Sequence, residues 1–295
     1  MGIRKTSVFD VVNIIILSLI GFVTFYPLYN MYVYAFNDGL DSLRGVLYLW
    51  PRQPTLFNFR LAFQNERLFR SFMVSLARTG IGTFITLLCT SSMAYALSKR
   101  RMPGYKALSM FFFITFIFNG GLIPYFLTIR TLGLYDTFWI LLIQGGIYSY
   151  WYMVLFRSFF ASIPDSIEES VKIDGGSYAT IFARMIVPLS KPVYAAIALF
   201  TAVGYWSEWF TGLFFIKNVK LVPLQTLLQK IMFESNAIQE LMKMSGGNLA
   251  NSNFNVTPNG LRLAIAVITI TPIICVYPFL QKYFIKGIML GSIKG

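Results

Sequence analysis

The sequence predicts an all-α polytopic membrane protein with six transmembrane helices. Hydrophobic residues make up 56% of the 295 residues and charged residues only 13%, whereas soluble domains carry about 25% charged residues. Mean hydropathy is +0.62. Uncharged apolar runs also recur along the chain at about 20 residues each, which is the length that crosses roughly 30 Å of hydrocarbon.

Five uncharged runs and one interrupted run define the expected spans. They are residues 11–36, 79–98, 107–129, 137–156, 263–281 and, interrupted only by Glu208, 192–216. The first run is too long for a signal-peptide core and no A-x-A cleavage site follows it, so we expect an anchor that stays. Residues 1–70 then form this anchor span with an external segment, and residues 71–295 form a core of five spans.

Two features within the runs need an explanation. The second span is expected to begin near Phe72, with Arg78 near its outer end, either snorkelling to the headgroups or paired. The third contains Asn119-Gly120-Gly121 and Pro124, which interrupt a helix. Such a break is tolerated at membrane depth in a water-filled cavity or where the backbone finds protein partners. Asn119 is therefore a candidate for either a transport path or a packing kink.

Basic residues predict the orientation. Lys99, Arg100, Arg101 and Lys106 crowd the loop between the second and third spans, whereas the short loop 131–136 has no basic residue. Short loops follow the positive-inside rule, so we expect both termini in the cytoplasm. Segments 37–70 and 217–262 are then external, and the loop 157–191 is cytoplasmic.

Several function classes lack the residues they need. The chain has no histidine and only two cysteines, Cys89 and Cys275, each inside an apolar run. We therefore expect no catalytic residue and no metal site. No Gly-Lys dipeptide occurs, so there is no Walker A phosphate loop. The net charge of +13 fits topology signals and lipid headgroups better than nucleic acid in a chain this apolar.

The cytoplasmic loop predicts two short helices joined by a glycine break. Ser162 is expected to cap the first helix, with Pro164 at an early position. Glu168 and Lys172 are spaced as an i, i+4 pair. Gly175 and Gly176 provide the left-handed stop, and the second helix starts near Ser177 and ends at Pro188. Its expected apolar face is Ile181, Phe182, Met185 and Ile186. Neither helix is long enough to stand alone in water, so each needs a surface, either its own bundle or a partner.

From Glu169 to Pro188 this loop resembles the EAA loop of permease subunits in type I ABC importers. Glu169 stands at the acidic position, Asp174-Gly175 at the Asp-Gly pair, and Val187-Pro188 where Leu-Pro is usual. Ser170, Val171 and Met185 depart from the family pattern by small or apolar substitutions. Further segments resemble the carbohydrate-uptake branch: residues 119–124, 132–134, 206–210, 222–225, 283–287 and 294–295. The chain is similar to the shorter maltose-type permease and closest to the subgroup for complex-polysaccharide fragments.

The resemblance implies a division of labour in the cytoplasmic membrane of a bacterium. This chain and a second, related permease would form a heterodimer in membrane lipid. A homodimeric ATPase would hold ATP and Mg, this chain binding no cofactor, and an extracytoplasmic solute-binding protein would deliver an oligosaccharide. The coupling helix, roughly Glu168–Tyr178, would act as a lever on the ATPase. The implied coupling residues are Glu168, Glu169, Lys172, Asp174, Gly175, Ser177, Tyr178 and Pro188.

Glu208 is the only acid within a span. A lone carboxylate in hydrocarbon is costly, so it should face a transport cavity or contact the partner permease. Tyr205, Trp206 and Trp209 either offer aromatic faces to a sugar or pack against other helices. Ser207 replaces an asparagine that is frequent in the family at this place, which weakens the transfer of a sugar contact. The external arginines suit either an acidic oligosaccharide or an acidic face of the binding protein: Arg44, Arg52, Arg60, Arg67 and Arg70.

Three rival functions differ from a sugar-importer permease. A type I importer for another solute shares the EAA loop and differs only in the other family-like segments. A self-contained secondary transporter or channel normally needs more intramembrane ionisable residues for ion coupling. A membrane-embedded enzyme needs a catalytic constellation, which this chain does not offer.

Overall fold

The computed structural model describes residues 7–42, 44–99, 102–143, 147–244 and 258–291. Within these ranges the chain is helical and forms no strand, apart from an isolated bridge between Asn37 and Pro54. The predicted all-α fold is therefore confirmed. The helices are α1 (Val8–Ala35), α2 (Gly39–Ser42), α3 (Phe57–Gln64), α4 (Glu66–Ser98), α5 (Tyr105–Ile117), α6 (Leu122–Thr131), α7 (Phe138–Ile143), α8 (Tyr150–Phe160), α9 (Asp165–Ile173), α10 (Tyr178–Ile181), η1 (Phe182–Ile186), α11 (Val187–Leu189), α12 (Lys191–Ser207), α13 (Phe210–Phe215), η2 (Val219–Leu221), α14 (Leu224–Met244) and α15 (Pro258–Gly291).

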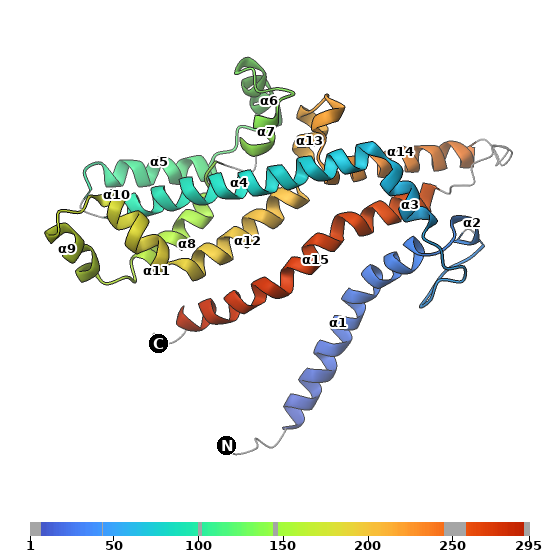
Figure 1. Cartoon of the computed structure of the whole chain (residues 1–295), viewed down its shortest axis with the longest axis horizontal. Coiled ribbons are helices and arrows are strands. Elements are labelled where there is room, and N and C mark those ends of the chain that lie inside the picture. The colour runs from blue at the N-terminus through green and yellow to red at the C-terminus, as the bar shows by residue number, and fades with distance from the viewer. Residues whose placement is uncertain (1–6, 43, 100–101, 144–146, 245–257, 292–295) are drawn as a thin grey trace. The chain divides into compact units, whose positions relative to one another are not determined.

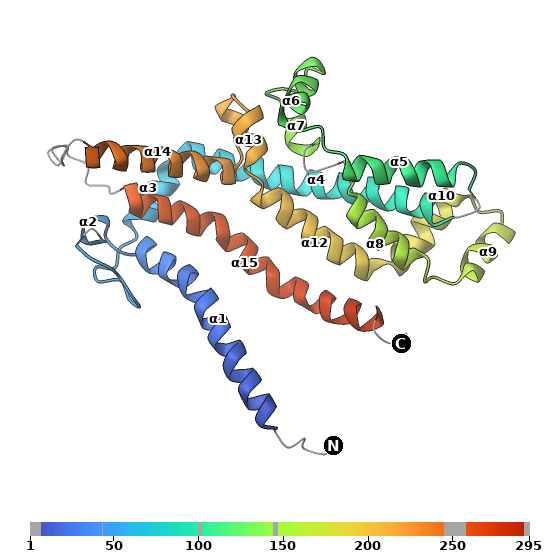
Figure 2. The same ribbon diagram turned by 180° about the vertical axis from the view of Figure 1, so that it is seen from behind.

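The chain divides into two compact units. Unit 1 comprises residues 1–68 and 230–271, and unit 2 comprises residues 69–229 and 272–295. Three long helices, α4, α14 and α15, contribute residues to both units (Figures 1 and 2).

In unit 1, α1 is long and apolar enough to cross a membrane. Ser7 and Asp10 form a capping box at its start, in which Asp10 Oδ2 accepts the Ser7 amide at 2.9 Å. Its best 18-residue window has a mean hydropathy of 2.3, and no residue of that window is buried inside the protein. The segment that follows α1 is held by two buried asparagines, Asn37 and Asn58. Asn37 Oδ1 accepts the Gln53 amide at 2.8 Å. Asn58 Nδ2 donates to the carbonyls of Ala35 and Asn37, at 3.0 and 2.9 Å.

In unit 2, three of the predicted spans are broken. The third becomes α5 and α6, bent by 114° at the predicted Asn119-Gly-Gly break. The fourth is divided between α7 and α8, and the fifth leaves the helix at Glu208, between α12 and α13. Continuous helices over 137–156 and 192–216 were expected, and this expectation is wrong.

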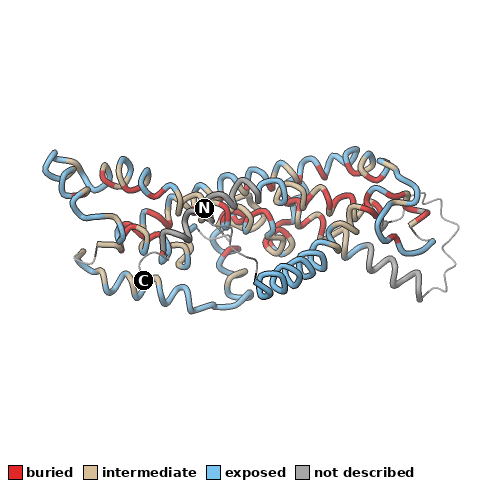
Figure 3. The backbone as a smooth tube through the Cα atoms, turned by 90° about the horizontal axis from the view of Figure 1, so that it is seen from below, coloured by how far each residue is buried: buried red, intermediate tan, exposed pale blue. Residues whose placement is uncertain are grey.

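Length and composition alone identify fewer crossings than the six apolar runs. Among the described residues, α1 and α4 are long and apolar enough to cross a membrane. The number of candidates rises to four if each of two bent helix pairs, α5 with α6 and 178–189 with α12, is one span. Long exposed stretches, pale blue in Figure 3, alternate with the buried positions along the helices.

Two apolar clusters hold unit 2 together. One joins α4, α8, η1 and α12 around Tyr95, Phe156 and Ile186. The other joins α6, α7 and α13 around Ile140 and Phe215. The first cluster lies beside the predicted coupling loop, and the second lies beside the broken spans.

Candidate functional site: the coupling loop and the broken spans

The first helix of the coupling loop ends in a Schellman turn. The amide of Gly175 donates to the carbonyl of Lys172 at 3.0 Å, and that of Gly176 donates to Val171 at 2.8 Å, which is the paired pattern of this motif. Gly175 has φ +78° with open space around it, whereas a Cβ at Gly176 would lie 2.5 Å from Val171 Cγ1. The predicted stop is confirmed, and the two glycines are needed for different reasons: conformation at 175 and space at 176.

The start of this helix differs from the prediction. Pro164 is the N-cap residue, and Ser162 does not cap the helix. The hydroxyl of Ser162 instead donates to the carbonyl of Phe159 at 2.7 Å. The helix thus begins without a side-chain cap, because the preceding turn uses the serine.

Glu168 does not pair with Lys172, contrary to the prediction. Its carboxylate is buried and forms an ion pair with Lys99, which directly follows α4. The Lys172 ammonium lies 4.8 Å from the ring centroid of Tyr178, within cation–π range. The coupling helix is therefore tied through Glu168 to the end of a long span.

The second short helix packs onto its own unit. Ser177 is its N-cap, and the serine Oγ accepts the Thr180 amide at 3.2 Å. Ile181 and Ile186 are buried, and Phe182 packs against the same cluster, so three of the four residues of the predicted apolar face pack on the unit.

Pro188 lies just past a π turn. The helix widens over Phe182–Ile186 and ends at Leu189, one residue after the predicted end. Proline has no amide hydrogen, so it cannot continue the α-helical hydrogen bonding. The first turn of α12 follows at Lys191, and the loop is thus joined directly to the fifth span.

A cleft of about 800 Å³ lies between the end of α4 and the coupling helix. Lys99 and Glu168 lie in its wall together with Glu169, Lys172 and Tyr178. Glu169, Lys172, Asp174, Gly175, Ser177 and Tyr178 are exposed. The structure therefore brings four of the predicted coupling residues, Glu168, Glu169, Lys172 and Tyr178, together in the wall of one cleft of ligand-binding size.

The broken spans meet at a buried arginine. Arg78 on α4 is completely buried. Its Nε donates to the Leu141 carbonyl at the end of α7, and its Nη1 donates to the Glu208 carbonyl at the end of α12, both at 2.9 Å. Its Nη2 pairs with the Glu208 carboxylate. Glu208 Oε1 also accepts the Thr211 amide in the first turn of α13, at 2.7 Å.

Glu208 therefore has a partner within its own chain. The Arg78 side chain is paired, not snorkelling. The Arg78 side chain is fully buried, whereas 25% of the Glu208 side chain is exposed, so the glutamate side chain reaches a surface of the unit.

Aromatic residues near Glu208 are unequally exposed. The Tyr205 ring is buried over Gly82, and its hydroxyl donates to the Leu142 carbonyl at 2.8 Å. Trp206 is also buried, with its ring edge-on to Phe72 at 5.7 Å. Trp209 retains partial exposure. Burial favours the packing interpretation for Tyr205 and Trp206 and leaves Trp209 and Glu208 as the candidates for contact with a solute.

Asn119 is exposed and stabilises the break in the third span. Its Oδ1 accepts the Gly121 amide at 2.9 Å, and Gly121 has φ +84°.

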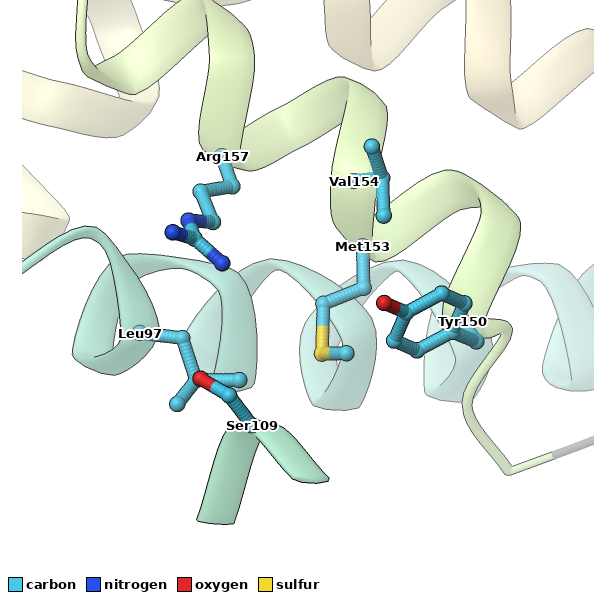
Figure 4. A pocket seen from close by; sticks show the side chains of 6 residues that line it. All are labelled: Leu97, Ser109, Tyr150, Met153, Val154 and Arg157. Atoms are coloured by element: carbon cyan, nitrogen blue, oxygen red, sulfur yellow. The ribbon is translucent and has the colours of Figure 1, made fainter. Parts of the chain in front are cut away.

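A separate pocket between α4, α5 and α8 has a volume of about 20 Å³. Figure 4 shows Met153 and Arg157 pointing into it. It holds about one water molecule, so it is too small for a sugar.

Comparison with known proteins shows which family has this architecture. Residues 83–289 match the family described as the binding-protein-dependent transport system inner membrane component. The chain belongs to this family. The resemblance to ABC importer permeases drawn from residues 169–188 is thereby confirmed, and a membrane location follows.

Relatives of this permease cover it end to end. Protein LplC of Bacillus subtilis (strain 168) is 37% identical over 293 residues, covering 99% of this chain and 97% of its own. The polygalacturonan/rhamnogalacturonan transport system permease protein YtcP of the same organism is 33% identical over 291 residues, covering 99% and 100%. A chain in the crystal structure of a bacterial ABC transporter involved in the import of the acidic polysaccharide alginate superposes with a TM-score of 0.84. It is 29% identical, with 96% of this chain and 99% of that chain covered.

Two ion pairs of the permease site do not follow from the sequence analysis: Lys99 with Glu168, and Arg78 with Glu208. The sequence predicts a topology role for Lys99 and, for Arg78, a side chain that snorkels or is paired with an unnamed partner. A signal for the second pair was present, because an arginine and a glutamate each within an apolar segment need partners.

Proposed function

We propose that this chain is the permease subunit of an ATP-driven importer for oligosaccharides derived from an acidic polysaccharide. One observation carries the proposal: two proteins similar to it over nearly the whole chain are named for acidic polysaccharides, polygalacturonan/rhamnogalacturonan and alginate. A third protein, LplC, has a name that says nothing of a substrate. An importer of the same type for a non-sugar solute is the alternative.

Charge near the spans supports an acidic cargo. Arg44, Arg60, Arg67 and Arg70 are exposed and lie before or at the start of the second span. Glu208, the acid of the fifth span, is neutralised by Arg78. An anionic solute would therefore meet little repulsion, although the same arginines also suit an acidic face of a binding protein.

The division of labour follows the family. A homodimeric ATPase with ATP and Mg would dock on Glu169, Lys172 and Tyr178, and this chain itself would hold no cofactor and catalyse nothing. A second permease would complete the path in the cytoplasmic membrane of a bacterium. The chain would cross six times, with both termini in the cytoplasm, and a solute-binding protein would deliver the sugar outside.

The test is ATPase activity of the reconstituted complex with loaded binding protein. Uronate oligosaccharides are compared with carboxyl-reduced oligosaccharides of the same length, and Gly175→Arg serves as the uncoupled control. We expect stimulation by the uronate ligand alone and none in the assembled variant. Equal stimulation by the reduced sugars would exclude the acidic specificity. Transport without any ATPase would exclude the importer.

A further inference from the structure

The external loop at residues 45–51 bends back along the end of α1, as Figures 1 and 2 show beside α2. Three successive carbonyls of this loop are satisfied by side chains of one helix. Asn30 Nδ2 donates to Leu47 at 2.7 Å, and the Tyr29 hydroxyl donates to Leu49 at 2.6 Å. The carbonyl of Tyr48 accepts from Tyr26 and Asn30 at 3.4 and 3.3 Å.

The base of the loop is also fixed. The Arg52 Nε donates to Asp41 Oδ2 at 2.9 Å. Hydrogen bonds from Asn37 and then Arg52 hold the pKa of Asp41 below its usual range, so this carboxylate stays ionised. Leu47 is buried, and its amide donates to the Tyr34 hydroxyl at 3.0 Å. The loop therefore has one defined conformation, held by hydrogen bonds and by the buried side chain of Leu47.

The large side chains that the loop 45–51 exposes are all apolar or aromatic. The exposed fractions are 61% for Val46, 67% for Tyr48, 55% for Leu49 and 76% for Trp50. No charged residue occurs between Arg44 and Arg52. Contact with water does not favour four such exposed side chains within five residues, so we expect another medium to cover the loop.

The position along α1 indicates which medium this is. Counting about 20 residues of hydrocarbon from Val11, at about 1.5 Å rise each, brings the far boundary to Asn30. The donors to the loop are Tyr26, Tyr29 and Asn30, so the loop lies level with this boundary. Backbone that leaves a helix near hydrocarbon must have its carbonyls satisfied by protein, as those of 47–49 are.

We propose that the loop 45–51 is an interfacial anchor that inserts Tyr48, Leu49 and Trp50 among lipid headgroups beside α1. Tyrosine and tryptophan favour this zone because their rings are amphipathic. The exposed apolar surface of α1 continues directly into the loop, and exposed Arg44 suits a lipid phosphate. Assignment to the outer leaflet rests on the orientation proposed above, whereas insertion itself does not.

Spin-label accessibility tests the anchor. In the full importer complex, with Cys89→Ser and Cys275→Ser and no other reactive cysteine, a nitroxide is placed at Trp50→Cys. The complex is reconstituted in vesicles of phosphatidylethanolamine and phosphatidylglycerol. Ile16→Cys, exposed within the apolar stretch of α1 that begins at Val11, and Gln64→Cys, exposed at the end of α3, are matched controls. A label at Tyr48→Cys repeats the measurement with Trp50 in place.

We expect the ratio of oxygen to nickel-chelate accessibility at positions 48 and 50 to lie above that at 64 and below that at 16. A ratio equal to that at 64 would place the loop in water and overturn the proposal. Exclusion of both reagents would show that a protein covers the loop and would overturn it as well. These outcomes do not depend on ATPase coupling or on the identity of the sugar.

Discussion

Arg78 is a single side chain that binds the ends of two helices directly and reaches a third through Glu208. The last carbonyls of a helix have no intrahelical partner, and a cation near them is stabilising. Arg78 supplies hydrogen bonds to the ends of α7 and α12, while its partner Glu208 accepts an amide at the start of α13. The planar fork of arginine allows these contacts at once, which the ammonium of lysine does not.

At this scale we predict that Arg78→Gln destabilises the permease by about 3 kcal/mol, because removing one partner of a buried pair leaves the other charge uncompensated. Arg78→Gln combined with Glu208→Gln should cost less than Arg78→Gln alone. Thermal unfolding of the purified complex for both single variants and the double variant gives the coupling energy. Strictly additive effects would contradict the pairing.

At the scale of elements, the coupling loop could be largely anticipated, because its rules are local. The glycine stop at 175–176, the start at Ser177 and the apolar face at Ile181 and Ile186 depend on neighbours a few residues away. The partner of Glu168 could not be anticipated. A lysine four residues away offered an i, i+4 pair, but such pairs contribute only about 0.2–0.5 kcal/mol. Lys99, 69 residues distant in sequence, is brought there by tertiary packing.

The breaks in the fourth and fifth spans were missed for a related reason. By hydropathy alone, Glu208 is a single charged residue that does not interrupt the apolar run 192–216. The helix stops there because the Glu208 carboxylate caps α13 and pairs with Arg78, 130 residues away. Asn119-Gly-Gly, by contrast, carries its break in its own residue types.

The Lys99–Glu168 pair predicts a charge-swap rescue. Lys99→Glu and Glu168→Lys should each lower the ATPase stimulation caused by loaded binding protein, because like charges would then force the coupling helix away from the end of α4. The double swap should recover much of the stimulation. Lys106→Glu changes the charge of an exposed lysine on α5 as the control. Equal losses in the single and double variants would exclude a positioning role for the pair.

At the scale of the whole molecule, the described helices supply fewer unbroken crossings than the apolar runs predict, so membrane sidedness is the informative measurement. With Cys89 and Cys275 replaced by serine, Arg60→Cys and Asp165→Cys report opposite ends of the long helix α4. We predict that a membrane-impermeant maleimide labels position 60 in intact cells. Position 165 should react only after permeabilisation, because the positive-inside loops place it in the cytoplasm.

Both positions are exposed in the structure, so burial within this chain does not account for a failure to react. Labelling of position 165 in intact cells would reverse the proposed orientation. Labelling of both positions would contradict a membrane crossing by α4.

During biosynthesis Arg78 is made well before its partner Glu208. The ribosome makes this residue 130 residues before Glu208, and at about 5–20 residues per second the wait is on the order of ten seconds. Until then the Leu141 carbonyl, made 63 residues after Arg78, is the one partner already synthesised, and the guanidinium otherwise uses water or lipid phosphate. A helix of 33 residues, about 50 Å long, is longer than the hydrocarbon is thick and can slide to allow this. We therefore expect the final depth of α4 in the membrane to be set once α12 and Glu208 have been synthesised.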